Sequence, residues 1–133
     1  MRRTNQGLAD KEYVLNRLGI PGVVLLDARS APEYSGTKVF AARGGHIPGA
    51  INIEWIQAMD QHRNLRLKPI EEIRAQFASQ GVTPDKEVIT YCQTHHRSAF
   101  SYVVLKLLGY PNIKGYMGSW SEWGNDSTTP VEL

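Results

Sequence analysis

The sequence contains a single cysteine, Cys92, among its 133 residues. An internal disulfide and a thioredoxin-like resolving pair are therefore excluded, and the fold does not depend on an oxidising compartment. No window approaches the roughly 20 continuous apolar residues of a membrane span, and residues 1–7 lack the apolar stretch of a signal peptide. These absences predict a cytoplasmic protein that has no contact with a membrane.

An excess of charge of one sign is also missing. The 15 basic and 13 acidic residues give a formal net charge of +2, and the basic ones are scattered rather than gathered into a run that could follow a polyphosphate backbone. The composition thus gives no case for a nucleic-acid partner. We expect one domain over residues 1–133, with residues 1–8 and 126–133 as flexible or linker-like ends.

Short apolar runs predict a buried sheet. Residues 23–26 form a continuous apolar run that ends at Asp27, as in a strand buried on both faces of a parallel sheet. Residues 87–91 are β-branched and aromatic and also predict a strand. Further short strands are expected at residues 50–53 and 113–116.

Helical segments alternate with these strands. Helices are expected at residues 9–18 with Asp10 as a possible cap, at 69–78 and at 98–108, with short helical turns around 32–35 and within 118–124. Strands that alternate with helices imply an α/β fold, with three layers and a mainly parallel central sheet.

Residues 92–97 alone separate the strand at 87–91 from the helix at 98–108. Ligands of open parallel sheets bind beyond the carboxyl ends of the strands, so this loop is the leading site candidate. The first helical turn offers unpaired N–H groups, and a loop curled around Cys92 would aim more of them at its sulfur. Helix-terminus interactions of up to about 2 kcal/mol favour an anion there, so we expect Cys92 to be a thiolate nucleophile at pH 7.

Four motifs, taken in order, resemble landmarks of the rhodanese superfamily. They are Asp27-Ala28-Arg29, residues 45–50 (GHIPGA), residues 92–98 (CQTHHRS) and residues 118–123 (GSWSEW). The family's active-site loop has the form Cys-x-x-x-x-Arg-Ser/Thr between a central strand and a helix, which residues 92–98 match without gaps. The resemblance covers roughly residues 8–132 and implies a rhodanese-like three-layer α/β/α domain.

The loop sequence itself is similar to that of tandem-domain bacterial thiosulfate sulfurtransferases, whose second half is catalytic. The chain would then correspond to that half, with an N-terminal rhodanese domain as a missing partner. The resemblance implies that Cys92 takes sulfane sulfur from thiosulfate or another persulfide donor, expels sulfite, and passes the sulfur from its persulfide to cyanide or a thiol. It implies no metal and no organic cofactor.

The rest of the loop is expected to bind the sulfur donor. The residues that would present hydrogen-bond donors to an anion are Gln93, Thr94, His95 and His96. We expect Arg97 to bind the donor's sulfonate, to pair with a carboxylate such as Asp27 or Glu33, or to do both. A metal site formed by the cysteine and the two histidines is disfavoured, because amides aimed inward turn these side chains outward and no fourth ligand is near.

Other motif residues are interpreted as structural. Asp27 and Arg29 are expected to form a buried ion pair that supports the loops around the site, with Ser98 as a further supporting residue. His46 and Pro48 are expected to shape their loop. Trp120 and Trp123 are most simply core or pocket-wall aromatics.

Several alternatives remain open. A lone cysteine at a strand end is often only a small buried residue. The domain could also be a persulfide carrier that is loaded by a desulfurase and docks on a biosynthetic partner. A cysteine-loop phosphatase or arsenate reductase is disfavoured, because a Cys-x5-Arg loop is one residue longer and wide enough for a phosphate. Retention of Cys92 and Arg97 disfavours a non-enzymatic interaction module.

One residue departs from the pattern of relatives. Mammalian tandem relatives often carry a substrate-binding arginine where Glu33 stands in this sequence. Recognition of the carboxylate of 3-mercaptopyruvate is therefore less expected than recognition of thiosulfate. The mercaptopyruvate branch also usually has Cys-Gly-Ser-Gly where residues 92–95 read CQTH.

Overall fold

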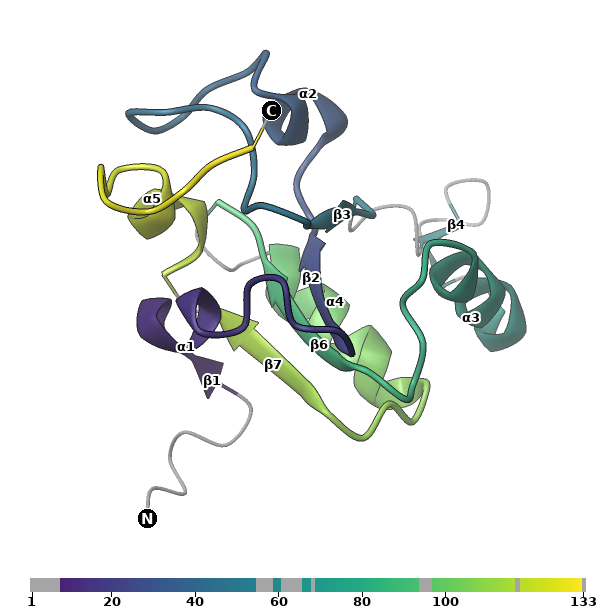
Figure 1. Ribbon diagram of the computed structural model, residues 1–133. Coiled ribbons are helices and arrows are strands. Elements are labelled where there is room, and N and C mark those ends of the chain that lie inside the picture. The colour runs from purple at the N-terminus through teal and green to yellow at the C-terminus, as the bar shows by residue number, and fades with distance from the viewer. Residues whose placement is uncertain are drawn as a thin grey trace.

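The computed structural model describes residues 8–54, 59–60, 66–67, 69–93, 97–116 and 118–132. At its centre lies a five-stranded sheet in the order β1-β7-β6-β2-β3 (Figure 1), and every pair of neighbours is parallel. Its strands are β1 (Leu8–Ala9), β7 (Ile113–Tyr116), β6 (Glu87–Tyr91), β2 (Val23–Asp27) and β3 (Ile51–Asn52). A separate antiparallel pair joins β4 (Met59–Asp60) to β5 (Arg66–Leu67). The mainly parallel α/β sheet expected from the sequence is confirmed.

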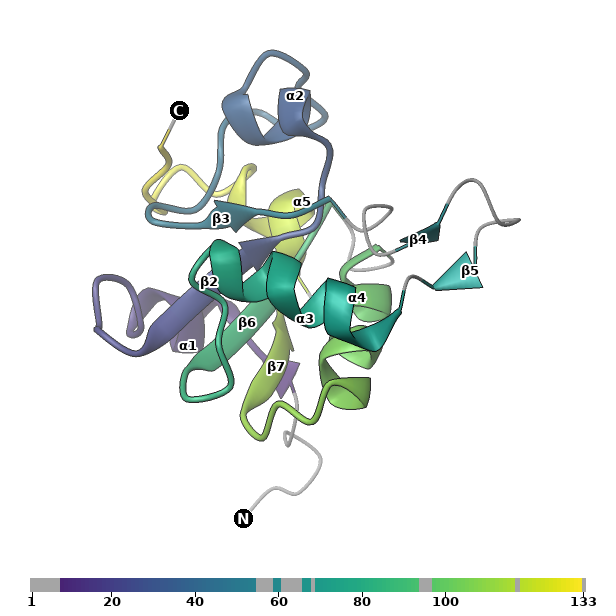
Figure 2. The same ribbon diagram turned by 90° about the vertical axis from the view of Figure 1, so that its right-hand side faces the viewer.

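Helices cover both faces of the sheet (Figures 1 and 2). They are α1 (Lys11–Leu15), α2 (Ala31–Ser35), α3 (Ile70–Ser79), α4 (Arg97–Leu107) and α5 (Ser119–Trp123). Side chains of α3 and α4 belong to one buried cluster, and side chains of α1 and α5 belong to another. No helix in the described ranges is both long enough and apolar enough to span a bilayer.

The two clusters are separated by the sheet itself. Val24 and Val88 of neighbouring strands pack into the cluster with α3 and α4, whereas Leu25 and Ile89 pack into the cluster with α1 and α5. Successive side chains of a strand point to opposite faces, so an apolar run without alternation supplies both cores. The continuous apolar run in β2 reflects the burial of this strand on both faces of the sheet.

The first helix is shorter than expected. Asp10 is its N-cap, and its carboxylate accepts the Tyr13 N–H at 2.8 Å, but α1 ends at Leu15 instead of residue 18. Beyond that point the backbone N–H of Arg17 bonds the carbonyl of Val14 at 3.0 Å. The chain therefore tightens into a turn with i,i+3 bonds before it enters β2.

The carboxyl-terminal segment 126–132 differs from the linker-like end expected there. Arg43 donates hydrogen bonds to the carbonyls of Trp123, Gly124, Asp126 and Thr129. At the other end, the backbones of His46 and Glu132 pair through two N–H···O bonds of 2.8 Å. The polar residues of this segment form turns whose carbonyls accept hydrogen bonds from Arg43. The segment is therefore packed against the domain in spite of its polar composition.

We predict that Arg43→Ala lowers the free energy of unfolding by about 2–4 kcal/mol, because it leaves several partly buried carbonyls without a donor. Urea unfolding followed by tryptophan fluorescence measures the loss. Arg74→Ala is the matched control, since Arg74 bonds only the Leu108 carbonyl and the exposed carboxylate of Glu71 among the described residues. A loss no larger than that of the control would contradict the anchoring role of Arg43.

Candidate active site

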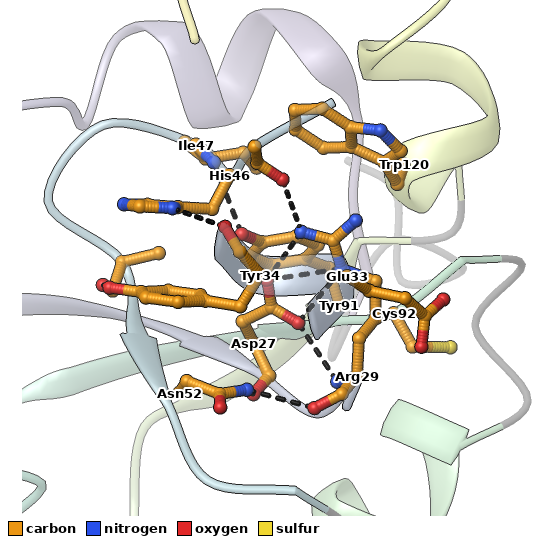
Figure 3. A network of polar contacts seen from close by, with 12 residues as sticks. Asp27, Arg29, Glu33, Tyr34, His46, Ile47, Asn52, Tyr91, Cys92 and Trp120 are labelled. Atoms are coloured by element: carbon orange, nitrogen blue, oxygen red, sulfur yellow. Dashed lines mark hydrogen bonds and ion pairs between the residues drawn. The ribbon is translucent and has the colours of Figure 1, made fainter. Parts of the chain in front are cut away.

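The candidate site lies where β2 and β6 end side by side. Asp27 and Tyr91, the last residues of these strands, are paired in the sheet register. Cys92 comes directly after Tyr91, and the loop after β2 and helix α5 approach the same end of the sheet (Figure 3). Two neighbouring parallel strands thus place a thiol and a carboxylate at the carboxyl end of the sheet, where α/β sheets bind ligands.

The expected ion pair between Asp27 and Arg29 is present and buried. The guanidinium Nη2 lies 2.7 Å from the carboxylate, and the side chains of Arg29 and Asp27 are 2% and 0% exposed. The same Nη2 donates to the carbonyl of Gly45 at 2.6 Å, and the guanidinium carbon lies 4.6 Å from the ring centroid of Trp120. One buried cation therefore joins β2, the loop around residue 45 and α5 (Figure 3).

Neighbouring polar groups support the segments that carry the pair. The Asn52 amide donates to the carbonyls of Asp27 and Arg29 at 3.1 and 2.8 Å. The hydroxyl of Tyr91 accepts the backbone N–H of Ile47 at 3.1 Å. Burial raises the pKa of Tyr91 well above its ordinary value, and the negative charge of Asp27 adds to the effect. The phenol is therefore neutral at physiological pH and serves to hold the loop.

Cys92 is a free thiol, and the residue is 1% exposed. Its backbone is fixed on both sides by α5: the N–H donates to the hydroxyl of Ser119 at 3.1 Å, and the carbonyl accepts the N–H of Trp120 at 2.8 Å. The burial alone fits a small packing residue, whereas the position at the end of β6 fits a nucleophile.

The side chain of Gln93 is weakly held. Its side-chain amide donates to the carbonyl of Phe40 at 3.4 Å, a long hydrogen bond. Its Oε1 is buried and has no hydrogen-bond partner within the described part of the chain. Because an unsatisfied buried acceptor is unfavourable, this side chain can turn away from Phe40 at little cost.

Most of the predicted loop lies beyond Gln93. Thr94, His95 and His96 lie outside the described residues, and Arg97 and Ser98 begin α4 without described side chains. Their expected roles stay predictions. In the parts of the chain that are described, no three side chains of the metal-binding types gather in one place.

The carboxylates expected to receive Arg97 already have partners. Asp27 is paired with Arg29. Glu33 is 4% exposed and accepts hydrogen bonds from the N–H and the hydroxyl of Ser30, which closes a capping box at the start of α2. Asp27 at the end of β2 and Glu33 in α2 therefore both have local partners near the site.

His46, Trp120 and Trp123, which the sequence interpretation treats as structural, lie in packed positions. The ring of His46 stacks on Tyr34 with 3.8 Å between centroids, and its Nδ1 lies 2.8 Å from the carbonyl of Tyr34. Trp120 and Trp123 are buried in the cluster with α1 and α5. The contact between Ser119 and Cys92 was missed, because the sequence marks Ser119 only as part of the GSWSEW motif and its contribution depends on backbone conformation.

In one class of α/β domains, a cysteine opens the loop between a central parallel strand and a helix, so that its thiol lies at the carboxyl end of the sheet. A family model described as the rhodanese-like domain matches residues 10–126. The chain belongs to this family, as the four sequence motifs indicated.

Its relatives include proteins named for sulfur transfer. The chain is 55% identical over 125 residues to a thiosulfate sulfurtransferase of Azotobacter vinelandii and 57% identical over 125 residues to one of Pseudomonas aeruginosa. It is 44% identical over 116 residues to a sulfur carrier protein of Thermus thermophilus, an alignment that covers 80% of this chain and 40% of that one. The alignments to the two sulfurtransferases cover 94% of the chain and 45% of each relative, so the chain spans less than half of their length.

Solved structures agree with the sequence comparison. An anaerobic ergothioneine biosynthesis enzyme from Chlorobium limicola, solved with trimethyl histidine, superposes with a TM-score of 0.87 at 28% identity. The match covers 96% of this chain and 32% of that one. The sheet and its helices therefore have the arrangement of a domain found within a larger enzyme.

We predict that Asp27→Asn lowers the free energy of unfolding by about 3–5 kcal/mol, because it leaves the buried guanidinium of Arg29 without a counter-charge. The double variant Asp27→Asn with Arg29→Met should recover part of this loss, and urea unfolding of the two single variants and the double variant gives the coupling energy. Strictly additive losses would show that the two charges do not depend on each other.

Proposed function

We propose that this domain is a thiosulfate sulfurtransferase in which Cys92 carries the transferred sulfur. The observation that carries the proposal is the identity of 55–57% to two thiosulfate sulfurtransferases over 94% of the chain. The position of Cys92 supports it, because its backbone is fixed at the carboxyl end of β6 by two hydrogen bonds to α5. The substrates and partners of the whole protein are part of the proposal.

The proposed cycle has two steps. The Cys92 thiolate attacks the outer sulfur of thiosulfate, a new S–S bond forms, the S–S bond of thiosulfate breaks, and sulfite leaves with the electron pair. Cyanide or a thiol then attacks the outer sulfur of the persulfide, and the thiolate leaves. In each step the nucleophile supplies the electron pair of the new bond, and the leaving group keeps the pair of the broken bond. The cycle therefore requires neither a metal nor an organic cofactor.

Anion binding is assigned to the loop that Cys92 opens. We propose that Gln93, Thr94, His95, His96 and Arg97 receive the donor's sulfonate oxygens, with Asp27, Arg29 and Ser98 as supporting residues. Gln93 has a further part in this proposal. Its weak hydrogen bond to Phe40 and its unpaired Oε1 suit a side chain that turns to admit the donor to the enclosed thiol.

A second function, a persulfide carrier, is favoured by one observation. The chain is 44% identical over 116 residues to a sulfur carrier protein. A carrier and an enzyme both form a persulfide at Cys92. They differ in steady state, since a carrier would show a very high KM for thiosulfate in the thiosulfate:cyanide assay.

Further proposals concern the surroundings of the domain. Because the matched relatives are about twice as long, we propose that an N-terminal rhodanese domain accompanies this one and that residues 1–133 form a single domain beside it. A lone cysteine that must stay reduced before each cycle fits the cytoplasm. Neither nucleic acid nor a membrane has a part in the proposed reaction.

We predict that incubation with thiosulfate adds the mass of one sulfur atom to the chain, and that cyanide removes it again. Intact-mass spectrometry measures both changes. Cys92→Ser should show no gain, because a hydroxyl is not ionised at pH 7 and cannot take the sulfur. Aryl phosphate hydrolysis that is lost in Cys92→Ser, without any gain of sulfur in the parent chain, would instead support a phosphatase.

We predict that Gln93→Glu raises the KM for thiosulfate about tenfold or more, because a carboxylate beside the entry to Cys92 repels a dianion. Gln93→Met keeps the size of the side chain but removes its hydrogen bonds to the donor without adding a charge, so it should raise KM by a clearly smaller factor than Gln93→Glu. Steady-state thiosulfate:cyanide kinetics at constant ionic strength separate the two. Equal KM values for both variants would place the donor elsewhere.

A further inference from the structure

Ser119 has a backbone conformation that serine rarely adopts. Its φ is +50°, and it is the only non-glycine residue with positive φ among the residues described. A left-handed conformation costs an L-residue about 1–2 kcal/mol, so it persists only where surrounding contacts determine it. Ser119 is fully buried, which means that these contacts come from the protein itself.

The contacts of Ser119 lead directly to the candidate nucleophile. Its hydroxyl donates to the carbonyl of Tyr116 at 2.9 Å and accepts the backbone N–H of Cys92 at 3.1 Å. The hydroxyl therefore donates its hydrogen bond to β7 and accepts one from Cys92. No other described side chain bonds the backbone of Cys92.

The next two residues continue the contact. The N–H of Trp120 donates to the carbonyl of Cys92, and the N–H of Ser121 donates to the carbonyl of Gln93, both at 2.8 Å. The first N–H groups of a helix have no partner within it. In α5 these groups bond the two residues that open the candidate loop.

This pairing fixes the orientation of the loop's first peptide. The N–H of Gln93 shares a trans peptide with the carbonyl of Cys92, so it points in the opposite direction, away from α5. A carbonyl oxygen carries partial negative charge and opposes a nearby thiolate, whereas an N–H favours one. With both carbonyls held on α5, neither is free to turn toward the sulfur.

We propose that Ser119 is a positioning residue for the sulfur transfer, and that it seats α5 so that the carbonyls of Cys92 and Gln93 are held away from the reacting sulfur. This inference rests on the proposed function. Ser119 does not itself contact the donor. It acts through the orientation of the peptides that begin the loop.

The test uses two variants of the 133-residue chain. Ser119→Gly accepts a φ of +50° without strain but lacks the hydroxyl. Ser119→Ala keeps the strain and also lacks the hydroxyl. Ser79→Ala is the matched control, because Ser79 likewise donates from Oγ to the carbonyl three residues earlier, at 2.7 Å, on the exposed surface of α3.

The readout is the rate of alkylation of Cys92 by iodoacetamide as a function of pH, measured by intact mass. We expect the pH midpoint to rise by about one unit in both Ser119 variants, which corresponds to about a tenfold weaker preference for the thiolate. The thiosulfate kcat/KM should fall by a similar factor. Ser79→Ala should keep the midpoint and the rate of the parent chain.

The outcomes separate this inference from the proposed function. A parent chain that takes no sulfur from thiosulfate and titrates near the free-thiol value of about 8.5 would overturn both. A parent chain that is active, with folded Ser119 variants that keep its midpoint, would overturn only the role of Ser119. Failure of Ser119→Gly to fold would also overturn that role, because it would make Ser119 a requirement of the whole fold.

Discussion

The arrangement around Cys92 depends on the buried ion pair of Asp27 and Arg29. Two charges with 0% and 2% exposure are tolerated only when each polar group finds a partner. The guanidinium meets this condition by bonding the carboxylate of Asp27 and the carbonyl of Gly45 while it lies over the ring of Trp120. Any displacement of these segments leaves a buried charge unpaired, so the pair selects one position for each of them.

Trp120 connects this constraint to the candidate nucleophile. Its ring receives the guanidinium of Arg29, its indole N–H donates to the carbonyl of Arg43 at 3.0 Å, and its backbone N–H donates to the carbonyl of Cys92. Arg43 in turn holds the segment after α5. The ion pair, the carboxyl-terminal segment and the start of the loop are therefore mechanically linked through one aromatic residue.

Features with a long sequence pattern could be predicted, whereas features that depend on a few contacts could not. The strand β6 could be predicted because it consists largely of β-branched and aromatic residues, and the body of α3 because its apolar residues share one face. The two-residue strands β1, β4 and β5 have no such pattern and are defined only by their neighbours. The same limit applies at the site: Cys92 stands out by residue type, whereas Ser119 matters through a backbone angle that no residue type reveals.

The enclosure of Cys92 bears on which reaction suits the site. Cys92 is 1% exposed, so little water is available to solvate an anion there, and the proposed thiolate depends on N–H groups directed toward it. The same enclosure would protect a persulfide from bulky thiols and oxidants. For the proposed function, such an enclosure favours small acceptors such as cyanide. Enclosure strengthens hydrogen bonds to an anion but hinders the access of substrates to the thiol. The weakly held side chain of Gln93 belongs to the residue that follows Cys92.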